Sequence, residues 1–388
     1  MTNFNKCLPV FLLLVACFVG IDAKELSEAS RPQWDRLTYD YPLEQLQGLR
    51  NLPLPKRGMT PEKLSRLTDE VTYILNTEEI PEFDQTVIPA YIANAQKDFA
   101  WLSVLTTGEP KGDLGPVTLW TLRLFIPDVN LPSVHEDAFD VYTSYLSSIV
   151  VSKSNQRLTQ ERANLKDYPI KKGQTLWRPT APGYVSLNLG SMKTWFLSSS
   201  DEFVIPEPTE DKEFWKAQCE DVISEQRNLD GKKVHAIFQW AGLTGINDGT
   251  WEKIVNDYIK KERMPLMEQL YLRALLSSAL VDANAVAAHS KYTYWVMRPS
   301  QMDSRIKPYL SIPNHPSCPS AHSTIAGTAA TILSKLIPQE KERWNALAEE
   351  SGMSRIWGGI HYPVDHKEGL NLGNEIGNRA LERNFQRD

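Results

Sequence analysis

Residues 289–366 contain three short runs that decide both the fold and the function of this chain: 291–299 (KYTYWVMRP), 319–323 (PSAHS) and 354–365 (SRIWGGIHYPVD). The runs supply a lysine, two arginines, several serines, two histidines and an aspartate, a set suited to binding a tetrahedral oxyanion. Five of the seven histidines of the chain also lie in this stretch. The function is therefore sought here first.

In the first run, Lys291 and Arg298 are seven residues apart. On one helix they would share a face, about 10 Å apart along the axis, and Pro299 would then end the helix. The planar fork of an arginine and the point charge of a lysine could approach one anion from different sides. The alternative for such a pair is a solvated helix face.

The second run precedes apolar residues at helical spacing, so it predicts a helix N-terminus, where backbone N–H groups and the helix dipole attract anions. Ser320 adds a hydroxyl, and His322 adds an imidazole that exchanges protons near neutral pH. In the alternative interpretation, Ser320 is only an N-cap and His322 is a surface residue.

In the third run, the glycines at 358–359 allow the backbone to turn closely beside a ligand, between Arg355 and His361. Asp365 follows His361 by four residues, about one helical turn. A carboxylate there could hold the Nδ1 proton of the imidazole and leave Nε2 free as a ligand or a nucleophile.

The rest of the chain predicts an all-α fold of packed helical bundles, because apolar residues recur every three to four positions and no strand–helix alternation or repeat is found. Thr60 followed by Pro61 predicts a helix start. Residues 24–60 predict an extended arm, and the proline-rich residues 155–210 predict a long irregular loop. Further helices are predicted at 86–107, 133–154, 212–228, 231–241, 248–262, 264–290, 322–337, 340–351 and 364–384.

The predicted organisation is a signal peptide (1–23), an N-terminal helical region (24–210) and a C-terminal helical catalytic domain (211–388). The first segment has a basic start, an apolar centre and a small residue at its end, which predicts export to the periplasm or medium. A lipobox-like sequence ends at Cys17, but the apolar run continues past it and favours cleavage instead. No later stretch has about 18 uninterrupted apolar residues, which argues against integral membrane association.

Amino-acid composition and net charge limit the classes of partner that the chain is expected to bind. With 388 residues, 41% hydrophobic and 23% charged, the chain is expected to fold. A net charge of −6 without a basic run argues against a nucleic-acid partner. After export only Cys219 and Cys318 would remain, which defines no disulfide framework.

The ordered set K-x6-RP, PSxH and SRxxxGxHxxxD resembles the superfamily of type 2 phosphatidic acid phosphatases and vanadium-dependent haloperoxidases, in particular its soluble haloperoxidase-like branch. The resemblance implies a helical bundle core. His361 would be the vanadium ligand or, in a phosphatase, the nucleophile; His322 would be the general acid/base, and Asp365 would orient His361. One departure is Ala321, where the family usually has glycine. Residues implied to bind the oxygens of vanadate or phosphate are Lys291, Arg298, Ser320, the N–H of Ala321, and Arg355.

Two activities fit these motifs. The first is a vanadium-dependent haloperoxidase with one vanadate per chain, in which Lys291 also polarises peroxide. His315, five residues before Ser320, lies where the family's bromoperoxidases carry histidine, which makes it a halide-pocket candidate and favours bromide or iodide. The alternative is a secreted acid phosphatase that hydrolyses phosphomonoesters through a phosphohistidine without a cofactor. A third hypothesis, based on Ala321, is an oxyanion-binding relative without turnover. The resemblance also suggests a homodimer.

Overall fold

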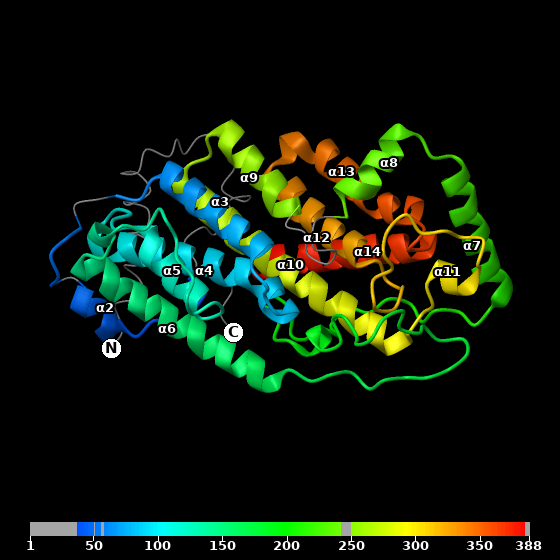
Figure 1. Cartoon of the computed structure of the whole chain (residues 1–388). Helices are drawn as coiled ribbons and strands as arrows, with labels where there is room; N and C mark the ends of the chain where they lie inside the picture. The colour runs from blue at the N-terminus through cyan, green and yellow to red at the C-terminus, as the bar shows by residue number, and fades with distance from the viewer. Residues whose placement is uncertain (1–36, 50, 56–57, 242–249, 385–388) are drawn as a thin grey trace.

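The predicted signal peptide (1–23), with the lipid-attachment candidate Cys17, lies outside the part of the chain that the structure describes. Figure 1 shows the whole chain as a computed structural model. The described residues are 37–49, 51–55, 58–241 and 250–384.

Helices dominate the fold, as Figure 1 shows. Among the described residues the β contacts are two isolated bridges, Gly58 with Lys111 and Leu176 with Val296. The all-α prediction is therefore confirmed. The α-helices are α2 (Leu43–Leu49), α3 (Pro61–Thr77), α4 (Glu82–Thr107), α5 (Leu114–Arg123), α6 (Val141–Asn164), α7 (Lys212–Arg227), α8 (Gly231–Gln239), α9 (Thr250–Glu262), α10 (Leu266–Tyr294), α11 (Pro299–Met302), α12 (Ala321–Leu336), α13 (Lys341–Trp357) and α14 (Pro363–Arg383). The 3-10 turns are η2 (Glu136–Ala138), η3 (Leu189–Ser191) and η4 (Pro338–Glu340).

Helix α3 starts where the sequence predicts. The Thr60 hydroxyl accepts a hydrogen bond from the backbone N–H of Lys63 at 3.2 Å, and Pro61 takes the first helical position, where its missing N–H is not needed. One apolar face of the helix is buried, as its spacing predicts. Its buried residues are Leu64, Leu67, Val71 and Ile74.

Two boundaries in the N-terminal region are wrong. Helix α6 continues to Asn164 because residues 155–164 contain no proline or glycine, so the irregular stretch begins at Leu165 instead of 155. The helix was predicted to begin at 133, but it begins at Val141. The Asp140 side chain caps it there by accepting a hydrogen bond from Thr143 N at 2.9 Å. Helix α5 was not predicted, because it is buried on nearly every side and so shows no amphipathic pattern. The arm predicted at 24–60 contains the short helix α2.

After residue 210 the predicted helices agree with α7 to α10 and α12 to α14 to within a few residues, except that α13 continues to Trp357. Pro299 was expected to end a helix, but it begins the short helix α11. Cys219 and Cys318 are both buried free thiols.

Helix α10 forms the centre of the molecule. It packs on α4 on one side and on α12 and α14 on another, and Figure 1 shows it between these groups. By length and composition it could cross a membrane, with a mean hydropathy of 1.2 over its most apolar window, but 94% of that window is buried inside the protein. The core helix of a folded protein can have the same length and composition, and α10 is such a core helix. The proposed division of the chain at residue 210 stays a prediction.

Helices α12 and α14 approach each other closely because α14 carries glycines on the facing side. A Cβ atom added to Gly373 would lie 2.2 Å from the backbone oxygen of Thr324, and one added to Gly369 would lie 2.8 Å from that of Ser320. No side chain fits there. This contact brings the start of α14 beside the start of α12, where the second and third sequence motifs meet.

Candidate active site

Lys291 and Arg298 do not lie on one helix, so that expectation is wrong. Helix α10 ends at Tyr294, and Trp295 follows with the left-handed φ of 56°. Arg298 has extended backbone angles as the residue before Pro299, where proline disfavours the helical conformation. Both cations nevertheless reach the same buried region, because the chain reverses between them.

His361 and Asp365 form a hydrogen-bonded pair at the start of α14. The Nδ1 atom of His361 lies 2.8 Å from Oδ2 of Asp365. The same carboxylate oxygen accepts from Ser317 Oγ at 2.5 Å and from Tyr362 N at 3.1 Å. An ionised carboxylate can only accept, so Nδ1 carries the proton and the lone pair of the neutral imidazole is on Nε2.

Arg298 contacts that lone pair directly. Its Nη1 lies 2.9 Å from Nε2 of His361, and it also donates to the carbonyl of Ile360 at 2.6 Å. Nε donates to the carbonyl of His315 at 3.2 Å, and Nη2 lies 3.1 Å from Nδ1 of the same residue. The side chain of Arg298 is fully buried. The guanidinium therefore joins the halide-pocket candidate His315 to the ligand candidate His361.

Lys291 supports the chain segment before α12. Its ammonium donates to the carbonyls of Pro316 at 3.0 Å, Ser317 at 2.7 Å and Pro319. An ammonium has three N–H bonds, so every donor has a protein acceptor in this arrangement. Burial and the charge of Arg298 lower the pKa of Lys291 well below its usual value, and its hydrogen bonds fix the loop that presents Ser320.

Ser320 caps α12 as the sequence predicts. Its hydroxyl accepts from Ser323 N at 3.3 Å, and its backbone N–H donates to the backbone oxygen of Asp365 at 3.0 Å. Ala321 is the first residue of α12 and is only partly buried. The N-terminal backbone groups of α12 thus meet the start of α14, as an oxyanion site at this helix end requires.

His322 and Arg355 are both hydrogen-bonded to the end of α8. His322 Nε2 lies 2.9 Å from the carbonyl oxygen of Trp240, and Arg355 Nη2 donates to the carbonyl of Ile237 at 2.6 Å. Arg355 Nε also donates to Ser354 Oγ at 2.9 Å. Carbonyls at a helix C-terminus lack partners within the helix, which explains why they accept from these side chains.

Gly359 has a φ of 74°, which favours glycine, so the predicted tight turn is present. The close neighbour is a protein side chain, since an added Cβ would lie 2.6 Å from Nε2 of Gln226.

Burial keeps the imidazoles of the site neutral. It lowers the pKa of His322 to about 3, helped by the positive charge of Arg355. It also lowers the pKa of His361 and His315 well below the usual value, with Arg298 and Lys291 adding to the effect. Burial lowers the pKa of Arg298 to about 10.

The basic side chains of Lys291, Arg298 and Arg355 are buried, as is the carboxyl of Asp365. Burial raises the pKa of that carboxyl, whereas Lys291 and Arg298 act on it in the opposite direction and lower its pKa. Its Oδ1 has no hydrogen-bond partner among the described residues. The guanidinium groups of Arg298 and Arg355, a helix N-terminus and one neutral imidazole whose Nε2 atom lies beside Arg298 fit a bound vanadate or phosphate.

Sequence reasoning missed Ser317 and the end of α8. Ser317 lies only three residues before Ser320, and its hydroxyl could have been considered for that reason. The contacts of Ile237 and Trp240 use backbone oxygens, which every residue type has, so no sequence signal could have identified them.

Comparisons with known proteins find similarity in part of the sequence and in the fold. Residues 270–379 match the model of the PAP2 superfamily. No curated protein sequence matches the chain. A crystal structure described as the first bacterial vanadium-dependent iodoperoxidase is similar, with a TM-score of 0.63 and 19% identity over 85% of this chain and 98% of that one.

Two structures of bacterial vanadium-dependent chloroperoxidase are also similar. The apo form has a TM-score of 0.55 and 14% identity over 87% of this chain and 97% of that one. The holo form has a TM-score of 0.54 and 12% identity over 88% of this chain and 98% of that one. The motif-bearing residues 270–379 are therefore similar to the PAP2 superfamily, and the chain has the fold of the vanadium-dependent haloperoxidase structures.

Proposed function

We propose that this chain is a vanadium-dependent haloperoxidase that oxidises bromide or iodide with hydrogen peroxide. The observation that carries the proposal is the Nε2 lone pair of His361. Asp365 fixes its position by accepting a hydrogen bond from Nδ1–H, with Nδ1 2.8 Å from Oδ2. The Nε2 atom of His361 lies beside the buried guanidinium of Arg298. The similarity to haloperoxidase structures along most of the chain supports the choice of this activity.

Lys291, Arg298, Ser320, the N–H of Ala321 and Arg355 would hold one vanadate per chain, with His361 as its nitrogen ligand. When bound, vanadate would supply a Lewis-acidic centre that activates peroxide toward halide.

The chain's own residues have separate tasks. His322 is neutral above a pH of about 3, so its imidazole is available to take a proton from peroxide. Arg298 would turn its Nη1 donor from His361 to the bound anion. Asp365 keeps the imidazole of His361 in one tautomer and orientation.

The halide preference is proposed from His315. This residue is buried and lies 3.1 Å from Arg298, so it belongs to the same cluster as the oxyanion ligands. Replacing it with phenylalanine is expected to lower kcat/KM for bromide and iodide, as measured by halide-dependent peroxide consumption. Unchanged values for both halides would remove His315 from the halide pocket.

A phosphomonoesterase is the second candidate, and the same lone pair favours it. A neutral imidazole with its lone pair on Nε2 and its Nδ1–H bound to a carboxylate is suited to nucleophilic attack on phosphorus once Arg298 turns to the bound anion. Arg298 and Arg355 would then stabilise the phosphoryl oxygens, and no cofactor would be needed.

One parallel assay separates the candidates. The purified protein is tested with vanadate, peroxide and bromide or iodide, and separately with a phosphomonoester without vanadate. Halide oxidation that His361→Ala abolishes supports the peroxidase; phosphomonoester hydrolysis that vanadate inhibits, without halide oxidation, supports the phosphatase. The exposed His135 gives the control His135→Ala, which should leave either activity unchanged. Phosphate binding without either activity would support the third hypothesis, an oxyanion-binding relative without turnover.

We also propose export after cleavage near Ala23, and assembly as a homodimer. N-terminal sequencing of the mature protein and light scattering test these two proposals separately.

A further inference from the structure

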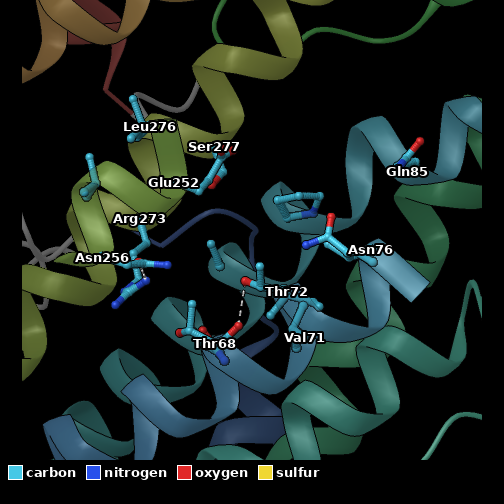
Figure 2. Close-up of a pocket in the computed structure, with 16 residues that line it drawn as sticks. Thr68, Val71, Thr72, Asn76, Gln85, Glu252, Asn256, Arg273, Leu276 and Ser277 are labelled. Carbon is cyan, nitrogen blue, oxygen red and sulfur yellow. Dashed lines mark hydrogen bonds between the residues drawn. The ribbon is translucent and has the colours of Figure 1, made fainter. Parts of the chain in front are cut away.

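A pocket away from the oxyanion site lies between α3, α4, α9 and α10 and is lined by none of the residues of that site (Figure 2). Its volume is about 110 Å³. Much of its wall is apolar, including Val71, Ile92 and Leu276, and Arg273 of α10 contributes a guanidinium. A cationic group in a mostly apolar wall is an uncommon combination that needs an explanation.

Arg273 is buried, with only 8% of its surface exposed. Its Nη1 donates to Oδ1 of Asn256, and Figure 2 shows the two side chains together at the pocket. Nε and Nη2 have no hydrogen-bond partner among the described residues. These two atoms form one edge of the guanidinium, and their N–H bonds point in parallel, which is the edge that a carboxylate binds with both oxygens.

Other cations near the N-terminal helices, one buried and one largely buried, have a carboxylate partner. Lys97 lies 2.9 Å from Asp98, and Arg157 lies 2.7 Å from Glu161. The carboxylate whose charge acts on Arg273 is Asp69, but no ion pair joins them, and Asp69 itself lies 2.8 Å from Lys260.

The desolvation of Arg273 is therefore only partly compensated within the described protein, by Asn256 and by the more distant charge of Asp69. Burial lowers its pKa to about 10, so the guanidinium stays charged at neutral pH. An isolated buried charge is costly, and an anionic ligand would offset that cost.

We propose that this pocket binds a small organic monocarboxylate, with its carboxylate on the Nε–Nη2 edge of Arg273 and its apolar body against the aliphatic wall. About 110 Å³ is less than the ~150 Å³ of an apolar cavity that accepts benzene, so the pocket suits an acid of about three to five carbons. A halide ion would fill little of this volume and leave the apolar wall without contacts. Glu252 also lines the pocket. Its negative charge would repel a carboxylate, which favours placing the charged end of the ligand at Arg273.

Neighbouring hydroxyl groups do not replace the arginine as donors. The Thr68 hydroxyl donates to the backbone oxygen of Leu64, and the Thr72 hydroxyl donates to that of Thr68, both at 2.8 Å. Both hydroxyl protons are therefore used within α3. We assign the binding of the carboxylate to the Nε and Nη2 donors of Arg273.

The test measures binding of butyrate to the full chain by calorimetry and by the shift in Tm at neutral pH. Butyrate should bind saturably and raise Tm, whereas butylamine, of similar shape and opposite charge, and bromide should do neither. Arg273→Met should weaken butyrate binding at least tenfold. The control Arg227→Met changes an exposed arginine of α7 and should bind as the wild type does.

A second variant covers the case in which Arg273→Met does not fold. Ala93→Leu fills the pocket from α4 and keeps the guanidinium, so it should also lose butyrate binding while circular dichroism stays unchanged. Equal binding of butyrate by wild type and Arg273→Met, equal binding of bromide or butylamine, or no binding of butyrate by the wild type would each overturn the proposal. Since none of these readouts uses halide or phosphoester turnover, the result is independent of the proposed function.

Discussion

The Nδ1 atom of His361 lies 2.8 Å from Oδ2 of Asp365, so one proton fixes the tautomer of the central imidazole. Asp365→Asn can present its amide N–H₂ to Nδ1, which would move the proton to Nε2 and remove the lone pair from that atom. We expect kcat to fall by about 10²–10⁴-fold. Asp365→Ala leaves the tautomer free and should retain more activity than Asp365→Asn, and the reverse order would contradict this role.

Ser317 is predicted to be a positioning residue. Its hydroxyl donates to Asp365 Oδ2 at 2.5 Å and lowers the pKa of that carboxyl, against the effect of burial. Ser317→Ala should therefore raise the pKa of Asp365 and lower kcat about 10–100-fold, with the acid limb of the pH–rate profile moved to higher pH. The exposed Ser148 provides the control Ser148→Ala. A lower kcat with an unmoved pH profile would indicate a purely structural role.

The elements that the sequence predicts well are those in which one local signal is sufficient. The start of α3 follows from a threonine cap and a proline at the first position, and Leu64 and Ile74 mark its buried face. Helix α5 lacks such a signal because tertiary packing buries it on nearly all sides. The reversal at Trp295 depends on one left-handed residue, and the spacing of Lys291 and Arg298 cannot show it.

The candidate site was predicted as a set of side chains, and the structure brings Lys291, Arg298, His315 and His361 into one buried cluster. The chemistry of each residue type could be read from its spacing. The carbonyl oxygens that hold Lys291, His322 and Arg355 could not, because backbone acceptors belong to every residue and only the fold selects them. Two of these carbonyls, those of Pro316 and Ser317, show that Lys291 also supports the loop before α12, a role that its spacing in the sequence does not indicate.

His322 should make the stability of the protein depend on pH. Its folded-state pKa is depressed to about 3, below the unfolded value near 6.5, so the unfolded chain binds more protons between these values. Stability should then fall as the pH falls from about 6.5 toward 3. Urea unfolding at pH 7 and pH 5 should show a smaller loss for His322→Asn than for the wild type. His135→Asn should lose as much as the wild type, and equal losses in all three proteins would contradict the depressed pKa.

The contact between α12 and α14 gives the last prediction, because it joins stability to the anion site. An added Cβ at Gly373 would lie 2.2 Å from the Thr324 oxygen, a backbone atom that cannot move without shifting α12. Gly373→Ala should lower the free energy of unfolding by about 1–3 kcal/mol. It should also weaken phosphate or vanadate binding, since the helix starts that carry Ser320 and His361 would separate.

The control for this change is Gly231→Ala at the start of α8, where no atom lies within 4 Å of an added Cβ. That variant should remain within about 0.5 kcal/mol of the wild type, as expected for a surface substitution. Denaturant unfolding gives the stability and calorimetry with phosphate gives the affinity. Gly373→Ala with the stability and the affinity of Gly231→Ala would show that α12 and α14 can separate slightly without cost, and that the close approach of the two helices does not build the site.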